Sequence, residues 1–141
     1  MNFVARFLLV LAIAAGVGAC ATTPPGGVAA DPTALPATFD RIWYRTAKVR
    51  LLGLAYEASG RLTVREDSLE FSHEDGVVTV PTGKIEKVTL GKLSPDIMNE
   101  WVIVHLTGSE PGALVAFKGA LFSGTSDRQL YSAVLRAAGR K

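Results

Sequence analysis

Few side chains in this sequence could do chemistry: two histidines and a single cysteine among 141 residues. His73 lies beside Glu74 and Asp75, and a histidine with two carboxylates could bind a metal ion. Adjacent residues rarely converge on one ion, however, so the sequence favours a solvated turn at this place. His105 follows an apolar run, which favours a half-buried structural histidine over a catalytic base. Neither histidine has a Gly-x-Ser-x-Gly motif to serve, so we expect no enzyme, no metal and no cofactor.

Cys20 has no second cysteine, so an intramolecular disulfide is impossible and a metal site built on several thiolates is excluded. Residues 1–6 carry one positive charge, residues 7–15 are all apolar, and small residues follow up to the cysteine. This order is typical of a secretory signal peptide. The apolar run is too short for a transmembrane helix, which needs about 20 residues.

The sequence Val17-Gly18-Ala19-Cys20 resembles the lipobox of bacterial lipoproteins, although valine is less usual than leucine at its first position. The resemblance implies cleavage by a type II signal peptidase before Cys20 and acylation of that cysteine, with palmitate among the acyl groups. It also implies that the protein faces the periplasm. Ala21, which is not aspartate, favours the inner leaflet of the outer membrane over the inner membrane. An ordinary cleaved signal with an incidental cysteine, or an uncleaved anchor, remain the alternatives.

Three regions follow along the chain. Residues 1–19 are the expected signal peptide, residues 20–38 are the lipidated cysteine with a Pro/Gly/Ala-rich tether, and residues 39–141 are one small domain. A flexible chain of about 17 residues spans roughly 20–25 Å, so the tether keeps the domain near the membrane. The 15 basic and 13 acidic residues nearly balance and form no basic stripe, so we expect no nucleic-acid partner.

Alternating apolar and polar residues predict strands over 60–65, 68–72 and 77–80, with a hairpin connection at 73–76. Further strands are expected over 84–90, 101–106 and 113–118, and a loop over 93–99. Ser126 and Gln129 form a capping-box pattern that opens a C-terminal amphipathic helix. The segment 39–58 fits either a helical face or a strand, and we favour a strand over about 48–56 after a short helical turn.

Strands followed by one closing helix indicate an α+β fold. The alternating strands over 60–71, followed by 78–81 and 85–88, resemble the PH-like superfold in its GRAM-like form. This resemblance implies a bent antiparallel β-sheet or split barrel, closed by the C-terminal amphipathic α-helix. The helix would turn its apolar side chains to the sheet: Leu130, Tyr131, Val134 and Leu135.

Four basic residues with no acid among them follow the tether: Arg41, Arg45, Lys48 and Arg50. They could contact anionic lipid headgroups, but we favour a solvated edge strand whose charges discourage pairing with another chain. The aromatic residues Trp43, Tyr44 and Trp101 could line a groove, although a core role is favoured in so small a domain.

The expected function is that of a membrane-anchored lipoprotein of the cell envelope. Its PH-like domain would be a non-catalytic protein-binding or scaffolding module, with an unknown envelope protein as partner. The alternative is a lipid or small-molecule carrier, which requires a hollow interior. An interior filled by five apolar side chains would argue against a carrier: Leu62, Val64, Phe71, Ile103 and Phe117.

Overall fold

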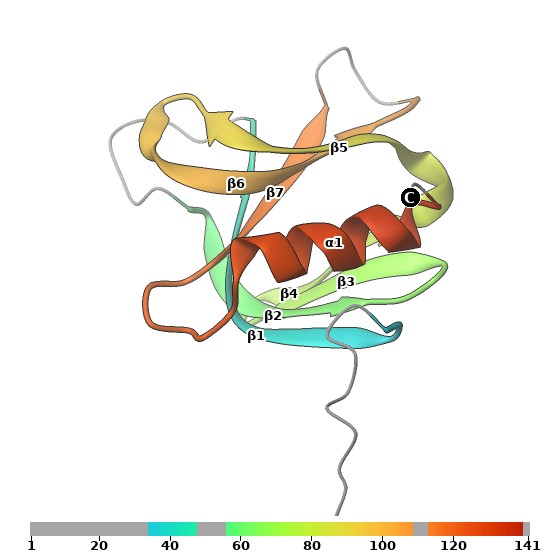
Figure 1. Ribbon diagram of the computed structural model, residues 1–141, viewed down its shortest axis with the longest axis horizontal. Helices are drawn as coiled ribbons and strands as arrows, with labels where there is room; N and C mark the ends of the chain where they lie inside the picture. Colours follow the sequence, from blue (N-terminus) through green and yellow to red (C-terminus); the bar gives the residue numbers. More distant parts are fainter. Residues whose placement is uncertain (1–33, 48–55, 109–112, 140–141) are drawn as a thin grey trace, which may run out of the picture.

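The computed structural model describes residues 34–47, 56–108 and 113–139 (Figure 1). The expected signal peptide, the lipobox with Cys20, and two of the four basic residues, Lys48 and Arg50, lie outside the described residues. No helix in the described part of the chain is long and apolar enough to cross a membrane. The elements are β1 (Ala37–Thr46), β2 (Ala58–Val64), β3 (Ser68–His73), β4 (Gly76–Pro81), the 3-10 helix η1 (Thr82–Lys84), β5 (Ile85–Leu93), β6 (Asp96–Leu106), β7 (Leu114–Gly119) and α1 (Asp127–Ala137).

The seven strands form one antiparallel sheet in the order β4-β3-β2-β1-β7-β6-β5. The sheet does not close, because β4 and β5 are its two edges. In Figure 1 the strands β1–β4 lie below α1 and β5–β7 lie above it, so the bent sheet wraps around the helix. The α+β class and the bent sheet with a C-terminal helix are therefore confirmed, in the open form of the sheet.

The main core lies between the inner face of the sheet and α1. Leu130 and Val134 are completely buried, and Tyr131 and Leu135 pack against the core as partly exposed side chains. The alternation predicted for β2 and β3 holds, since every second side chain is buried there: Leu62, Val64, Leu69 and Phe71. The helix thus contributes the apolar face that so small a sheet needs for a core.

The favoured prediction for residues 39–58, a short helical turn before a strand over about 48–56, was wrong in its described part. Residues 48–55 of the predicted strand lie outside the described residues. Residues 37–46 form β1 and no helical turn. A β-bulge between Phe39 and Ile42 adds one residue, with Arg41 at φ 53°. Because of the bulge, the inward-facing residues Phe39 and Ile42 are three positions apart, whereas Ile42 and Tyr44 are two apart. A spacing of three resembles that of one helical face, which explains the wrong prediction. β1 is also the central strand, so the edge-strand interpretation was wrong as well.

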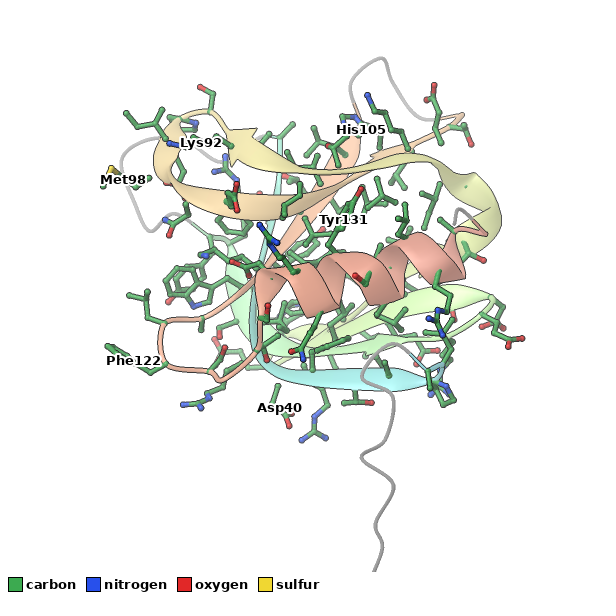
Figure 2. The ribbon with its side chains drawn as sticks, in the orientation of Figure 1. Asp40, Lys92, Met98, His105, Phe122 and Tyr131 are labelled. Atoms are coloured by element: carbon green, nitrogen blue, oxygen red, sulfur yellow. The ribbon has the colours of Figure 1, made fainter. Side chains whose placement is uncertain are left out.

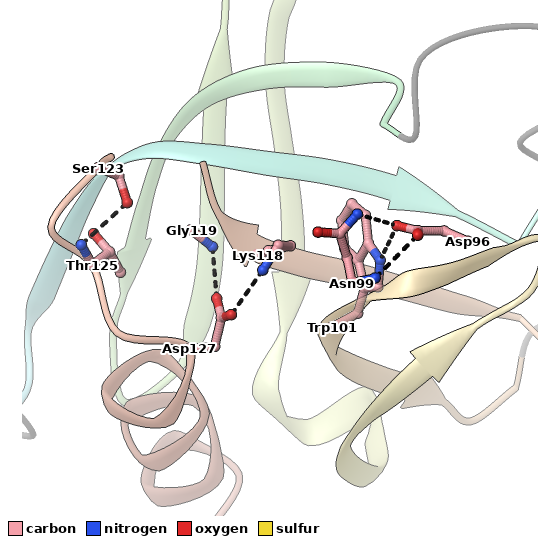
Figure 3. A network of polar contacts seen from close by, with 8 residues as sticks. All are labelled: Asp96, Asn99, Trp101, Lys118, Gly119, Ser123, Thr125 and Asp127. Carbon is pink, nitrogen blue, oxygen red and sulfur yellow. Dashed lines mark hydrogen bonds and ion pairs between the residues drawn. The ribbon is translucent and has the colours of Figure 1, made fainter. Parts of the chain in front are cut away.

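Two local predictions also need correction. The expected loop over 93–99 is a hairpin in which only Ser94 and Pro95 lie between β5 and β6. Ser126 is the N-cap residue of α1 as predicted, but its hydroxyl does not make the hydrogen bond of a capping box. Asp127 instead accepts hydrogen bonds from the backbone N–H of Gly119 and the Nζ of Lys118, both at 2.9 Å (Figure 3).

Candidate functional site

A second apolar cluster lies on the face of the sheet opposite the main core. Trp101, Ile103 and Ala116 are buried in it, from β6 and β7. Trp43 of β1 and Tyr56 pack against them, and their rings stack with centroids 4.6 Å apart. Strand β6 is therefore covered on both faces, as its continuous apolar sequence predicts.

Arg45 is completely buried beside Trp101 of this second cluster. Its guanidinium carbon lies 5.5 Å from the centroid of the Trp101 ring. Its nitrogens donate to the carbonyl oxygens of Ser94 at 3.1 Å and of Leu93 and Thr46 at 3.4 Å. No carboxylate of the described residues forms an ion pair with it. A cation–π contact and carbonyl dipoles offset part of the cost of burying this charge.

This position disagrees with both sequence interpretations of Arg45, the possible lipid contact and the favoured solvated edge strand, because both require an exposed side chain. A buried guanidinium that binds the turn between β5 and β6 does not contact a lipid surface. Arg45 instead connects the central strand β1 to the β5–β6 hairpin. We call residues 93–99 the hairpin tip.

Asp96 organises the hairpin tip through four hydrogen bonds. Figure 3 shows those from Asn99 and Trp101. The Nε1 of Trp101 and the Nδ2 of Asn99 donate to its Oδ2 at 2.9 Å each, and the backbone N–H groups of Met98 and Asn99 donate to its Oδ1 at 3.1 Å each. Partial burial raises the pKa of Asp96, but these bonds outweigh that effect and the pKa lies below its usual value. The ionised carboxylate therefore fixes the conformation of the hairpin tip.

The fixed hairpin tip exposes two large apolar side chains. Ile97 is 68% exposed and Met98 is 85% exposed. Figure 2 shows Met98 at the outer end of the hairpin, pointing away from the sheet. Asp96 and Arg45 hold the backbone on either side of this pair, so Ile97 and Met98 are presented to solvent in one arrangement.

A second exposed apolar pair lies in the turn between β7 and α1. Leu121 is 66% exposed and Phe122 is 94% exposed, and Phe122 projects from the turn in Figure 2. The backbone N–H of Ser123 donates to the carbonyl of Ala120 at 3.0 Å and closes a β-turn, with Phe122 at φ 61°. We call residues 120–123 the Phe122 turn.

Arg41 supports the Phe122 turn from the bulge of β1. Its Nη2 donates to the carbonyl oxygen of Phe122 at 2.8 Å, and its own carbonyl accepts from the N–H of Ala120 at 2.9 Å. Arg41 is exposed, as the sequence prediction of a surface contact requires. Beside it lies a shallow recess of about 380 Å³, which is lined by Asp40, Arg41, Ser59, Gly60, Arg61 and Ser72.

The two histidines occupy structural positions in the sheet. The ring of His73 stacks on that of Phe71 with centroids 5.5 Å apart, and the Nε2 of His105 lies 3.3 Å from the Oγ1 of Thr89. Within the described ranges, no three histidine, cysteine or acidic side chains come together in a way that could hold a metal ion.

The aromatic residues follow the core interpretation. Tyr44 belongs to the main core, where burial raises the pKa of its hydroxyl, with a smaller contribution from the charge of Glu57. Four of the five side chains named for a filled interior are buried in the main core: Leu62, Val64, Phe71 and Phe117. The fifth, Ile103, is buried in the second cluster. This packing argues against the carrier alternative, because these side chains occupy the space that an acyl chain would need.

Sequence reasoning missed Asp96, Ile97, Met98, Leu121 and Phe122. A signal existed at both places. Ile97-Met98 follows Ser-Pro-Asp, and Leu121-Phe122 stands between glycines at 119 and 124, so each apolar pair lies where turn residues predict exposure. Two adjacent apolar side chains in a turn cannot reach the core, so they are exposed, and such exposed apolar surface often marks an interaction site.

The chain matches no family model and no curated protein. Its structure is similar to the Vps36 N-terminal PH domain, with a TM-score of 0.53 and 13% identity over 72% of this chain and 76% of that chain. Weaker similarities are to a chain in the structure of the Spt16D Pob3N heterodimer (TM-score 0.49, 13% identity, 74% of this chain and 50% of that one) and to one in the 8S snRNP assembly intermediate (TM-score 0.48, 10% identity, 72% and 80%). The similarity to the Vps36 domain, together with the seven-stranded open sheet and its C-terminal helix, shows that this chain has a PH-like fold.

Proposed function

We propose that this protein is a membrane-anchored envelope lipoprotein whose PH-like domain is a non-catalytic protein-binding module. The signal-peptide pattern with Cys20 in a lipobox supports the anchor. The anchor would face the periplasm, on the inner leaflet of the outer membrane. The PH-like fold and the hairpin tip support the binding module.

The observation that carries the binding proposal is the exposed pair Ile97 and Met98 on a fixed backbone. Burying such a side chain against a partner contributes about 1.5–3 kcal/mol. Binding normally loses part of that gain when a mobile loop becomes ordered. Here the hydrogen bonds of Asp96 order the backbone before any partner arrives. An apolar pair displayed in this way is suited to enter a recess on another protein.

The anchor is tested by growing cells with labelled palmitate and comparing the full chain with its Cys20→Ser variant. The wild-type chain is expected to carry the label and to lose its first 19 residues. The variant is expected to lose both properties, because the thiol is the acylated group. A Cys20→Ser chain that still carries palmitate would contradict the assignment.

The binding module is tested by placing a photocrosslinking amino acid at position 98 of the full chain in intact cells. Position 74, exposed in the β3–β4 turn, is the matched control site. A discrete protein adduct is expected from position 98 alone. It should disappear in an Ile97→Ser background and persist in a Val77→Ser background, because Val77 is also an exposed apolar residue but lies on β4. Equal adducts from positions 98 and 74 would count against the hairpin tip.

A further inference from the structure

We infer that the Phe122 turn is a second membrane contact, in which Leu121 and Phe122 enter the interfacial region of an anionic bilayer and Arg41 binds headgroup phosphates. The inference concerns a surface other than the hairpin tip. It rests on the proposed lipoprotein anchor, which keeps the domain beside the bilayer.

The backbone of the Phe122 turn is the first observation. Its hydrogen bond from Ser123 to Ala120 places Leu121 and Phe122 at the two corner positions, and Phe122 has a positive φ at the second corner. This is the position of a type II turn that favours glycine. A large aromatic side chain there is strained, and at 94% exposure it gains almost nothing from packing. Strain of this kind at an exposed residue points to a role outside the fold.

The charges around the turn are the second observation. Arg41 holds the Phe122 carbonyl with its Nη2, so its guanidinium lies at the base of the apolar corner. In the adjoining recess, Arg61 forms an ion pair with Asp40 at 2.5 Å, so these two charges compensate each other. The remaining net charge of the recess is that of Arg41. A protruding aromatic residue above an arginine suits the membrane interface, where rings lie at headgroup level and cations meet phosphates.

The exposed pair and the neighbouring Arg41 match what a membrane interface binds. Only two large apolar side chains protrude, and they are followed by Ser123, Gly124 and Thr125, which offer no apolar surface beside them. Association with a membrane interface is strengthened by a small apolar tip and by a nearby cation, and here the proposed lipid anchor supplies the other membrane signal.

The position of the tether allows this contact. Ala34, where the described chain begins, and Leu35 line a shallow pocket with Arg136 and Ala137 at the C-terminal end of α1. The Phe122 turn precedes the other end of α1. The 11 residues of α1 span about 16 Å, and the tether that the composition of residues 20–33 predicts would span roughly 20 Å. The anchor and the turn can therefore reach one bilayer together when α1 lies along its surface.

The test places a tryptophan at position 122 of the full, acylated protein in vesicles that contain brominated anionic lipids, which quench only nearby indoles. Lys84→Trp is the matched control, because Lys84 is exposed in η1. The segment between β4 and β5, to which η1 belongs, lies at the right of Figure 1, and the turn between β7 and α1 lies at the left. The wild-type chain gives the background from Trp43 and Trp101. The tryptophan at position 122 is expected to lose most of its emission and the one at position 84 to keep it. Replacing the anionic lipids with zwitterionic ones should weaken the quenching.

Each other outcome has a defined meaning. If the protein remains on the vesicles but position 122 is not quenched, the membrane contact is wrong while the anchor holds. If the protein does not remain on the vesicles, the anchor fails, and the membrane contact that rests on it fails with it. If position 122 becomes shielded only when envelope proteins are added, its partner is a protein and the inference is overturned.

Discussion

Replacing Phe122 with glycine should stabilise the domain. Phe122 has a φ of 61°, which places its Cβ close to neighbouring backbone atoms, and glycine has no Cβ. Because 94% of the residue is exposed, the folded state gains very little from the phenyl ring. The substitution therefore removes strain and removes almost no packing.

The magnitude follows from three contributions to the free energy of unfolding. Relief of the left-handed conformation is worth about 1–2 kcal/mol. The greater freedom of glycine in the unfolded chain takes back about 0.5–1 kcal/mol. Loss of the small buried area of the ring takes back a few tenths of a kcal/mol. The midpoints of these ranges leave a net stabilisation of about 0.5 kcal/mol for Phe122→Gly. In a domain of this size, 1 kcal/mol raises the midpoint of thermal unfolding by about 4–8 °C, so the expected rise is about half of that.

The measurement is guanidinium unfolding followed by the fluorescence of Trp43 and Trp101, which the substitution leaves in place. Phe122→Ala is the matched control, because alanine also lacks the ring but keeps the Cβ. It should lie within about 0.5 kcal/mol of the wild type, as do most exposed substitutions. If the glycine variant is no more stable than the alanine variant, Phe122 is not strained, and the link between its backbone and a function is lost. A more stable glycine variant that no longer contacts vesicles would show that stability has been given up for function.

Four further substitutions test the contacts around the proposed surfaces. Asp96→Asn should lower the free energy of unfolding at pH 7 by about 1.5–3 kcal/mol, since it weakens charge-assisted bonds. Because the pKa of Asp96 is lower in the folded state, its ionised form stabilises the fold fully above the unfolded pKa of about 3.9. Unfolding curves measured over a pH series should therefore show the difference in free energy of unfolding between wild type and Asp96→Asn shrinking as the pH falls through the folded pKa. Gly60→Ala should cost about 1–3 kcal/mol or more in urea unfolding, because its Cβ would lie 2.1 Å from the carbonyl oxygen of Ser72. Asp127→Ala should lower the free energy of unfolding by about 1–2 kcal/mol, while Ser126→Ala should change it by less than about 0.5 kcal/mol. A lower melting temperature for Ser126→Ala than for Asp127→Ala would support the capping-box prediction instead.

The sequence predicted those parts of the fold in which local pattern and tertiary structure agree. Strands β2, β3 and β4 alternate with a period of two, and the positions of Leu62 and Phe71 are buried as this period requires. The terminal helix was predicted because Leu130 and Val134 repeat at helical spacing. In each case one residue class faces one side of one element, so the pattern needs no knowledge of distant contacts.

The prediction failed where one position depends on a distant part of the chain. The bulge in β1 has no local signature, because its extra residue is fixed by pairing with β2 and by the Phe122 turn. The burial of Arg45 depends on the hairpin tip, 48 positions away. Composition assigns an arginine to the surface by default, since charged residues are almost never fully buried without a partner. The partners of Arg45 are backbone carbonyl groups, which every residue has, so the sequence of side chains does not indicate them.

The two arginines that the sequence suggested as lipid contacts therefore have a common role that charge counting does not predict. Arg41 holds the carbonyl of Phe122, and Arg45 holds the carbonyl of Ser94. They stand four positions apart on β1, a separation of about 13 Å along a strand, and each fixes a turn that exposes an apolar pair. A guanidinium is suited to this because its several N–H donors bind carbonyl oxygens in a set geometry, which a lysine does not. If both surfaces function as proposed, the central strand positions the membrane contact and the protein-binding hairpin relative to each other, and a partner bound at Met98 is kept close to the bilayer.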